Sequence, residues 1–224
     1  MTDAQASTDS QTSAPEIKTL DDLNRPHING CLRTMRELRA YLKADLYRYA
    51  GRTSTSVFWR HFLFTPGYKY TVWMRLCGYL RVRPATRYTF YPIVKYILLR
   101  CRYKYGIAIP ENCVIGPGLF INRFGGIYVN SDAIIGSNVN FTHGIMLGQH
   151  NRGALMGSPI VGDRVFLAAG SKVIGRVRLG DDSVVGANAV VTKDVPPMGV
   201  VGGIPAKVIS MQGSVGYINR QAKV

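Results

Sequence analysis

The sequence predicts a mainly β fold, a parallel β-helix solenoid, with an N-terminal α-helical region before it. The first observation is a repeat: from about Ile109 onward, an aliphatic or aromatic residue returns every six positions, commonly followed by a small or polar residue. A six-residue period fits neither a helix nor a simple exposed hairpin, and its persistence marks a solenoid. The second observation is a long basic and aromatic stretch before the repeat, which indicates several helices.

The repeat also predicts how the solenoid is built. Each hexad forms one side of a triangular coil, its first and fifth residues point inward, and backbone amides pair between coils, so stability comes from contacts between neighbouring coils. Two interruptions stand out: Ile127 and Tyr128 add two residues before Val129, and residues 153–160 add eight. We expect the second interruption to belong to a loop that projects from the solenoid.

The chain divides into four segments. Residues 1–15 are too polar and small to bury a core, so we expect a disordered tail. Residues 16–104 form the basic aromatic helical region, residues 105–210 form the β-helix domain, and residues 211–224 form a C-terminal tail.

No apolar segment follows the start, so we expect no secretory signal, and the four cysteines show no metal-binding or disulfide spacing. These observations favour a cytoplasmic protein. The most apolar stretch, around Tyr88–Leu99, is interrupted by Lys95 and falls well short of the roughly 20 residues that a spanning helix needs. We therefore exclude a transmembrane protein.

The formal net charge of +15 is concentrated in one segment. No acidic residue occurs between Asp45 and Glu111, whereas twelve Lys and Arg residues do, interleaved with Tyr, Trp and Phe. This mixture suits peripheral contact with an anionic membrane, at the inner leaflet of the plasma membrane. Nucleic acid attracts the same charge and is the less favoured partner. The simplest alternative is an amphipathic helical layer whose aromatic residues pack and whose basic residues are solvated.

The segment Tyr103–Ser210 resembles the hexapeptide-repeat acyltransferases, and within them the serine acetyltransferase branch with its capsule and exopolysaccharide relatives. The stretch PIVGDRVFLAAGSKVIGRVRLGDDSVVGANAVVTKDVPPMGVVGGIPAKVIS is similar to the C-terminal half of that family, whereas NFTHGIMLGQHNRG and INRFGGIYVN look more like the polysaccharide enzymes. The resemblance implies left-handed coils, a homotrimer with active sites between neighbouring subunits, and acetyl-CoA as acyl donor.

Three hexads make one coil, so residues one coil apart lie above one another, spaced by about 4.8 Å. One side of the solenoid then carries the hexads that begin at Ile121, Phe141, Leu167 and Val185. Their third residues form a single column of Arg123, His143, Ala169 and Ala187. Beside the histidine, the two alanines leave a narrow strip for the pantetheine arm of CoA, and the resemblance implies small residues at Ala169 and Ala187 for this purpose.

Acetyl transfer to a hydroxyl requires a base, and histidine suits this role because its pKa is near neutrality. His143 lies on the predicted wall, and His150 lies at the root of the predicted loop. His27 and His61 precede the coils and are expected to be structural. The catalytic candidates are therefore His143 and His150, and the alternative for His143 is a stacked surface histidine. The sequence leaves open which of the two is the base.

The chain departs from the family at several positions. The serine enzymes have a histidine where Arg123 stands, an aspartate where Asn122 stands, a second loop histidine at Ser158 and an acidic residue at Ala108. Arginine stays protonated and is a poor base at pH 7. We expect Arg123, with Asn122 beside it, to bind an anionic acceptor through a bidentate contact. A salt bridge at the rim of the site is the alternative for Arg123.

The segments VTKDVPPMG and GGIPAK resemble the family's binding segment for the 3′-phospho-ADP end of CoA. Thr192, Lys193 and Lys207 occupy the matching places, and lysine or an exposed amide is what that phosphate requires. The alternative is that the two lysines are ordinary surface residues that contact only solvent. We expect no metal, because a zinc site of the γ-carbonic anhydrase type needs three histidines and the coils carry two.

The preferred prediction is an acetyl-CoA-dependent O-acetyltransferase that acts on a sugar or sugar-lipid hydroxyl in capsule, exopolysaccharide or lipopolysaccharide biosynthesis. One alternative is serine O-acetyltransferase of cysteine biosynthesis, which Arg123, Asn122 and Ser158 weaken. Another is a catalytically silent β-helix binding subunit. The missing family histidine allows a silent subunit, and the intact residues for the CoA end argue against it.

Overall fold

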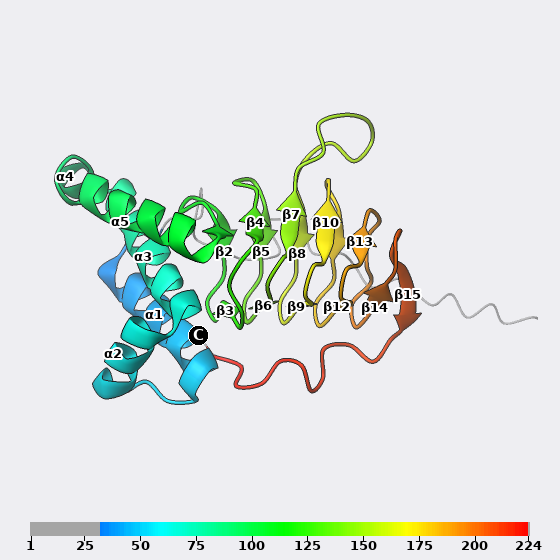
Figure 1. The fold of residues 1–224 in the computed structure, drawn as a ribbon, viewed down its shortest axis with the longest axis horizontal. Coiled ribbons are helices and arrows are strands. Elements are labelled where there is room, and N and C mark those ends of the chain that lie inside the picture. Colours follow the sequence, from blue (N-terminus) through cyan, green and yellow to red (C-terminus); the bar gives the residue numbers. More distant parts are fainter. Residues whose placement is uncertain (1–31, 224) are drawn as a thin grey trace, which may run out of the picture.

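The computed structural model describes residues 32–223 and places a group of helices at one end of an elongated solenoid (Figure 1). The expected disordered tail, residues 1–15, lies outside the described residues. No helix within residues 32–223 is long and apolar enough to cross a membrane. The helices are α1 (Met35–Ala50), α2 (Thr55–Phe64), α3 (Pro66–Arg81), α4 (Pro84–Arg87) and α5 (Phe90–Tyr105).

Local sequence signals determine where the long helices begin and end. At the start of α1, the N–H of Glu37 donates to the Thr34 side chain, and the Thr34 N–H donates to the Glu37 carboxylate. Gly51 and Gly106 follow α1 and α5 at φ values of 69° and 60°, in the left-handed region that glycine adopts without steric cost. Pro66 begins α3, where its missing N–H is not needed.

The solenoid is a left-handed parallel β-helix of short strands, which confirms the predicted fold (Figure 1). Each of the first four coils contributes one strand to each of three sheets, and the last coil contributes to two of them. The strands are β1 (Ile107–Ala108), β2 (Val114–Ile115), β3 (Phe120–Ile121), β4 (Ile127–Val129), β5 (Ile134–Ile135), β6 (Asn140–Phe141), β7 (Met146–Gly148), β8 (Ile160–Val161), β9 (Phe166–Leu167), β10 (Lys172–Ile174), β11 (Arg178–Leu179), β12 (Val184–Val185), β13 (Val190–Val191), β14 (Val200–Gly202) and β15 (Lys207–Ser210).

The three sheets form the three sides of the coil. The five-stranded sheet has the order β1-β4-β7-β10-β13, the four-stranded sheet has the order β11-β8-β5-β2, and the six-stranded sheet has the order β15-β14-β12-β9-β6-β3. All pairs are parallel except β14 with β15, which is antiparallel and closes the far end of the six-stranded sheet.

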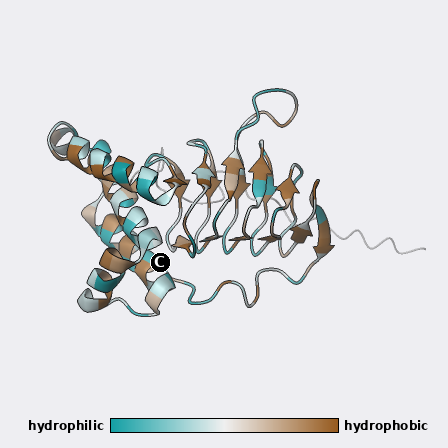
Figure 2. Ribbon diagram, viewed as in Figure 1, coloured by the Kyte–Doolittle hydropathy of each residue, from teal (hydrophilic) through white to brown (hydrophobic). Residues whose placement is uncertain are grey.

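Inward side chains stack from coil to coil, as the six-residue period predicts. Ile121, Phe141, Leu167 and Val185 lie opposite one another in consecutive strands of the six-stranded sheet. Each exposes 1% or less of its surface, and the strands of the solenoid are predominantly hydrophobic (Figure 2). Each coil therefore covers the apolar side chains of the next, and the stability of the solenoid comes from contacts between neighbours.

A buried ion pair joins the helices to the first coil. Asp45 of α1 accepts hydrogen bonds from Nε and Nη2 of Arg75 in α3, at 2.9 and 3.2 Å. It also accepts from the backbone N–H groups of Gly118 and Leu119, each at 2.9 Å. Arg75 in turn donates to two carbonyl oxygens at the end of β2 and just after it. Asp45 and Arg75 expose 0% and 5% of their surface, so this junction is closed to water.

The C-terminal tail runs back along the solenoid from β15 to the helices (Figure 1). We call residues 214–222 the C-terminal strap. Ile218 of the strap is buried, and the Tyr217 ring lies 4.8 Å from the Phe166 ring, centroid to centroid. The hydrogen bonds of the strap join Tyr217 to Asn140, Asn219 to Arg48, Arg220 to Tyr49, and Ala222 to both polar atoms of the Asn138 side chain. The strap therefore links the solenoid to the end of α1.

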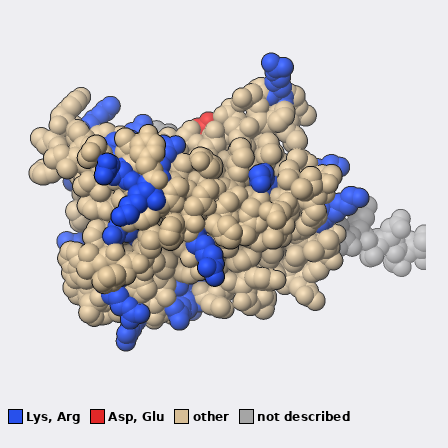
Figure 3. All heavy atoms as spheres, viewed as in Figure 1, with Lys and Arg blue, Asp and Glu red and all other residues tan. Residues whose placement is uncertain are grey.

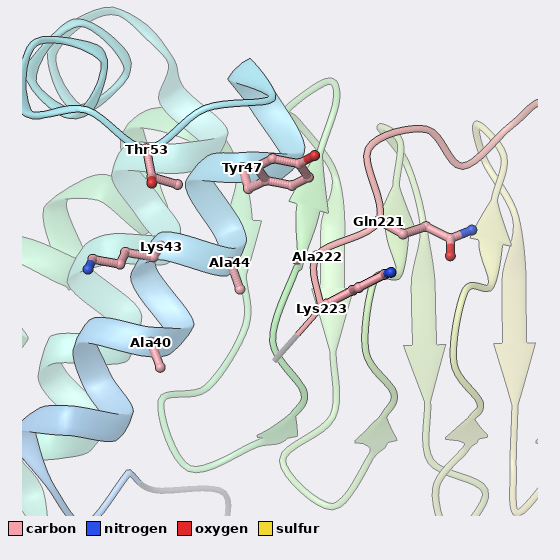
Figure 4. A pocket seen from close by; sticks show the side chains of 8 residues that line it. All are labelled: Ala40, Lys43, Ala44, Tyr47, Thr53, Gln221, Ala222 and Lys223. Carbon is pink, nitrogen blue, oxygen red and sulfur yellow. The ribbon is translucent and has the colours of Figure 1, made fainter.

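A cavity of about 630 Å³ lies between the strap and α1 (Figure 4). Ala40, Ala44 and Tyr47 of α1 line one side of it, and Gln221 and Lys223 line the other. The strap is thus anchored at the last turn of α1, and the space between them opens beside the earlier turns.

We expect the substitution Ile218→Ala to lower the free energy of unfolding by about 2 kcal/mol, because it removes buried apolar volume where the strap meets the solenoid. Val215→Ala is the matched control, since Val215 lies in the same strap and is 79% exposed. Urea unfolding of both variants measures the effect. Equal stabilities for the two variants would show that the burial of Ile218 does not stabilise the folded state.

Candidate active site

Two edges of the solenoid carry the residues predicted for the site. The turns that connect the six-stranded sheet to the five-stranded sheet form the His143 edge. The turns that connect the five-stranded sheet to the four-stranded sheet form the His150 edge. Each edge repeats once per coil, so residues on it lie at successive levels of the solenoid.

His143, Ala169 and Ala187 occupy successive levels of the His143 edge. The carbonyl oxygen of His143 accepts from the N–H of Gly170 at 2.9 Å, and that of Ala169 accepts from the N–H of Asn188 at 2.8 Å. His143 and Ala187 are exposed and Ala169 is half-buried. This part of the expected column is therefore present, as an open strip of small residues beside an imidazole.

Arg123 lies on the same edge but outside this column, which corrects the predicted register. The N–H of Gly144 donates to the carbonyl oxygen of Gly125 at 2.8 Å, so the residue level with His143 in the preceding coil is Gly125. Arg123 and the neighbouring Asn122 are both exposed in the turn before this glycine. Both side chains are thus accessible to a ligand at the rim of the His143 edge.

The reason for the shift is the position of the two extra residues in this coil. The repeat predicted them at Ile127 and Tyr128, but Tyr128 pairs regularly with Met146 in the five-stranded sheet. The extra residues instead widen the turn of residues 122–126. Gly125 and Gly126 have φ values of 103° and 66°, in a region that side chains other than glycine rarely adopt.

His150 lies at the root of the loop that follows β7 and projects from the solenoid (Figure 1). Its N–H donates to the Gly157 carbonyl at 3.0 Å, and the Gly157 N–H donates back to the His150 carbonyl at 2.9 Å, which closes the loop. Nδ1 of His150 lies 2.6 Å from the carbonyl oxygen of Arg152. Because a carbonyl oxygen only accepts, this contact requires a protonated Nδ1, and that tautomer leaves Nε2 as the acceptor. The N–H of Arg152 also approaches Nδ1, at the longer distance of 3.4 Å, and a hydrogen bond there would require the opposite tautomer.

The loop is also anchored by residues that the sequence analysis did not assign. The Ser158 hydroxyl donates to Oδ1 of Asn130 at 3.0 Å, and Nδ2 of Asn130 donates to Oε1 of Gln149 at 3.2 Å. Ser158 was singled out only as the place of a missing histidine. Neither a period nor a motif relates it to Asn130, so no signal in the sequence pointed to this contact.

The residues predicted for the phosphate end of CoA lie on different edges. Lys207 lies opposite Gly202 in the antiparallel pair of β14 and β15, one coil beyond Ala187 on the His143 edge. Thr192 and Lys193 follow β13, on the His150 edge. Within one chain, the structure therefore places Lys193 and Lys207 on different edges of the solenoid.

No cluster of three or more His, Cys, Asp or Glu side chains suited to a metal occurs in the part of the chain that the structure describes. Of the candidate side chains, only His150 is oriented by a hydrogen bond from its ring within this part of the chain. The arrangement therefore offers an oriented imidazole on one edge and an open strip with an imidazole on the other.

Comparison with known proteins assigns the chain to a family. Residues 158–193 match the family model for the bacterial transferase hexapeptide (six repeats). The chain is 35% identical to a serine acetyltransferase of Helicobacter pylori over 152 residues, which are 68% of this chain and 86% of that protein. It is 43% identical to a serine acetyltransferase of Mycobacterium tuberculosis over 104 residues, which are 46% of this chain but only 45% of that protein. Among solved structures, soybean serine acetyltransferase complexed with serine is similar with a TM-score of 0.65 and 28% identity, covering 78% of this chain and 70% of that chain.

These relatives correct the predicted acceptor. A sugar hydroxyl was predicted because NFTHGIMLGQHNRG resembles the polysaccharide enzymes and because Arg123 replaces a histidine. The relatives and the solved structure named above are serine acetyltransferases, so the prediction of a sugar acceptor is wrong, and no relation to the capsule enzymes is shown. The predictions of an acyltransferase and of acetyl-CoA as its donor are confirmed at the level of the family. The chain belongs to the serine acetyltransferase family of hexapeptide-repeat acyltransferases.

Proposed function

We propose that this chain transfers the acetyl group of acetyl-CoA to the hydroxyl of L-serine. The observation that carries the proposal is the match to the Helicobacter pylori serine acetyltransferase, which extends over 86% of that protein. The soybean enzyme, whose structure is a complex with serine, supports the same acceptor through its similar fold and 28% identity.

His150 is the general base of the proposed reaction. Because Nδ1 is held by the carbonyl oxygen of Arg152, Nε2 accepts the proton of the serine hydroxyl. The hydroxyl oxygen forms a bond to the thioester carbonyl carbon, and the C–S bond breaks. The proton then passes from Nε2 to the departing thiolate of CoA. His143, on the other edge, is the alternative base.

The proposed site lies between subunits of a homotrimer. A homotrimer, which the family resemblance implies, brings the His150 edge of one chain against the His143 edge of the next. The pantetheine arm then lies along Ala169 and Ala187, whose small side chains leave room for it. The division of Lys193 and Lys207 between the two edges supports this arrangement, because both then reach one phosphate from neighbouring chains.

Arg123 binds the carboxylate of L-serine in this proposal. Serine is an anionic acceptor at its carboxyl end, and a guanidinium fits a carboxylate through two parallel hydrogen bonds. Arg123 is exposed at the rim of the His143 edge, with Asn122 beside it. Within residues 32–223 no carboxylate forms an ion pair with Arg123, so the guanidinium is available to the substrate.

We expect Arg123→Gln to raise the KM for L-serine by about 10-fold to 100-fold, because a charge-assisted bidentate contact contributes roughly 1.5–3 kcal/mol. The KM for acetyl-CoA should stay within about twofold. Steady-state kinetics with each substrate varied in turn measures both constants. Arg36→Gln, an exposed arginine near the start of α1, is the control. Equal effects of the two substitutions would contradict the role of Arg123.

A catalytically silent β-helix subunit that binds CoA is the second candidate function. The observation that favours it is the set of three replacements, Asn122, Arg123 and Ser158, at positions where the serine enzymes carry acidic or histidine side chains. Ser158 is engaged in a structural hydrogen bond to Asn130, which suits a residue retained for the loop and not for proton transfer.

The test measures release of CoA from acetyl-CoA with L-serine, with D-serine and glycine as acceptor controls. Calorimetric titration with CoA accompanies it. Release that requires L-serine supports the proposed reaction. Tight CoA binding without release under any condition supports the silent subunit, and the absence of both binding and release contradicts both functions.

A further inference from the structure

Helix α5 exposes a row of large apolar side chains. Its inner face is buried through Val94, Leu98 and Cys101, each of which exposes 9% or less of its surface. On the opposite face, large apolar residues recur at spacings of three, four and seven, which places them on one side of the helix. These are Ile93, Tyr96, Leu99 and Tyr103, exposed by 60%, 61%, 37% and 77%. An apolar row of this extent has no cover within residues 32–223.

Basic side chains lie among these apolar residues. Arg100 and Lys104 are exposed on the same side of α5, and basic side chains gather over the helices in the space-filling view (Figure 3). A groove of about 630 Å³ between α3 and α5 continues the surface, and Lys69 and Trp73 of α3 line its other wall. No acidic side chain lines the groove.

The acidic side chains closest in sequence to this surface are already engaged. Asp45 is paired with Arg75, at 2.9 Å, in the buried junction. Glu111 is paired with Lys95, at 2.6 Å, on the other flank of α5. Neither ion pair involves Lys69, Arg100 or Lys104, and no other carboxylate within residues 32–223 pairs with them. The surface therefore keeps an unbalanced positive charge.

We propose that this surface docks on an anionic lipid bilayer. We define it as the docking face: Ile93, Tyr96, Leu99, Arg100, Tyr103 and Lys104 of α5, with the groove beside them. Tyrosine rings and aliphatic side chains lie favourably at the boundary between lipid headgroups and acyl chains. Arginine and lysine beside them are attracted to anionic headgroups. The inference is independent of the reaction proposed above.

Two other occupants fit the docking face less well. A second copy of the chain would bring Arg100 and Lys104 against another basic surface, with no acidic residue to pair with them. A nucleic acid would match the charge, but its phosphate backbone offers no apolar phase for Ile93 and Leu99. A bilayer satisfies both the charged and the apolar side chains at once.

The test is co-sedimentation of the full chain with vesicles. Vesicles of phosphatidylcholine alone are compared with vesicles in which about a third of the lipid is phosphatidylserine. We expect binding to the second kind only. The substitutions Arg100→Gln and Lys104→Gln together should weaken it by about 25-fold, about fivefold for each charge. Tyr96→Ser and Tyr103→Ser together should weaken it by about tenfold, since they remove apolar contact with the bilayer.

The control variant carries Lys172→Gln and Arg176→Gln, which remove the same charge from exposed positions on the solenoid. It should bind the anionic vesicles as the unmodified chain does. Both tryptophans, Trp59 and Trp73, lie in the helical region, so a blue shift of their emission on anionic vesicles provides a second readout. Circular dichroism verifies that every variant is folded.

Several outcomes would overturn the proposal. The first is no binding to anionic vesicles, and the second is an equal loss of binding in the control variant. The third is vesicle binding that the tyrosine substitutions leave unchanged and that duplex DNA competes away. A change of oligomeric state in the Arg100→Gln, Lys104→Gln variant, measured by analytical ultracentrifugation, would instead identify the face as a contact between copies.

Discussion

The substitution His150→Gln is expected to lower kcat/KM for L-serine by about 10²–10⁴-fold, the usual contribution of a general base. Glutamine keeps a polar side chain of similar reach but cannot accept a proton at neutral pH. The backbone bridge between His150 and Gly157 does not use the side chain, so the loop should stay closed. Affinity for CoA, measured by calorimetry, should change by less than about twofold, because His150 acts on the serine hydroxyl and is not one of the residues proposed to hold the pantetheine arm or the phosphate of CoA.

The matched control is His143→Gln, an exposed histidine on the other edge without an orienting hydrogen bond within residues 32–223. We expect it to reduce kcat/KM by less than about tenfold. A large loss for His143→Gln with a small loss for His150→Gln would assign the base to the His143 edge. Equal small losses for both would mean that neither histidine is the general base.

The stacking of the solenoid was predictable from the sequence because every coil repeats the same geometry. Counting in sixes was enough to place Leu167 opposite Val185, and once the eight residues of the projecting loop were set aside it also placed Phe141 opposite Leu167. An inward position must be apolar at every level, since each coil buries the one before it. For the same reason the level of His143 above Ala169 could be predicted before the structure was seen.

The position of an insertion could not be predicted in the same way. Counting detects that two residues are extra, but it does not show which turn absorbs them. The backbone absorbs them where residues tolerate positive φ, at Gly125 and Gly126, and Ile127 stays in its strand. Arg123 was therefore assigned to a column in which Gly125 stands.

Contacts between residues that no sequence repeat relates could not be predicted. The strap is polar and irregular, and Ala222 bonds to Asn138 across 84 residues of chain. The acceptor was mispredicted for a related reason: single departures such as Arg123 and Ser158 carried more weight than the overall likeness of the domain.

Asp45 drew attention only as the last acidic residue before the basic stretch, yet its substitution should have the largest effect on stability. We expect Asp45→Ala to lower the free energy of unfolding by about 3–5 kcal/mol, because it leaves the buried guanidinium of Arg75 without its counter-charge. The N–H groups of Gly118 and Leu119 also lose their acceptor, and a buried donor without a partner is destabilising by about 1–3 kcal/mol. Urea unfolding monitored by tryptophan emission measures the change.

The double variant Asp45→Leu, Arg75→Met separates the contribution of the ion pair to stability from the contribution of the hydrogen bonds. Replacing a buried ion pair with apolar side chains of similar size is often neutral or stabilising, so part of the loss should be recovered. Recovery should stay incomplete, because the N–H groups of Gly118 and Leu119 and two carbonyl oxygens near β2 remain without side-chain partners. A single variant that loses less than about 1 kcal/mol would mean that apolar packing alone, through residues such as Tyr70 and Ile121, holds the helices on the first coil.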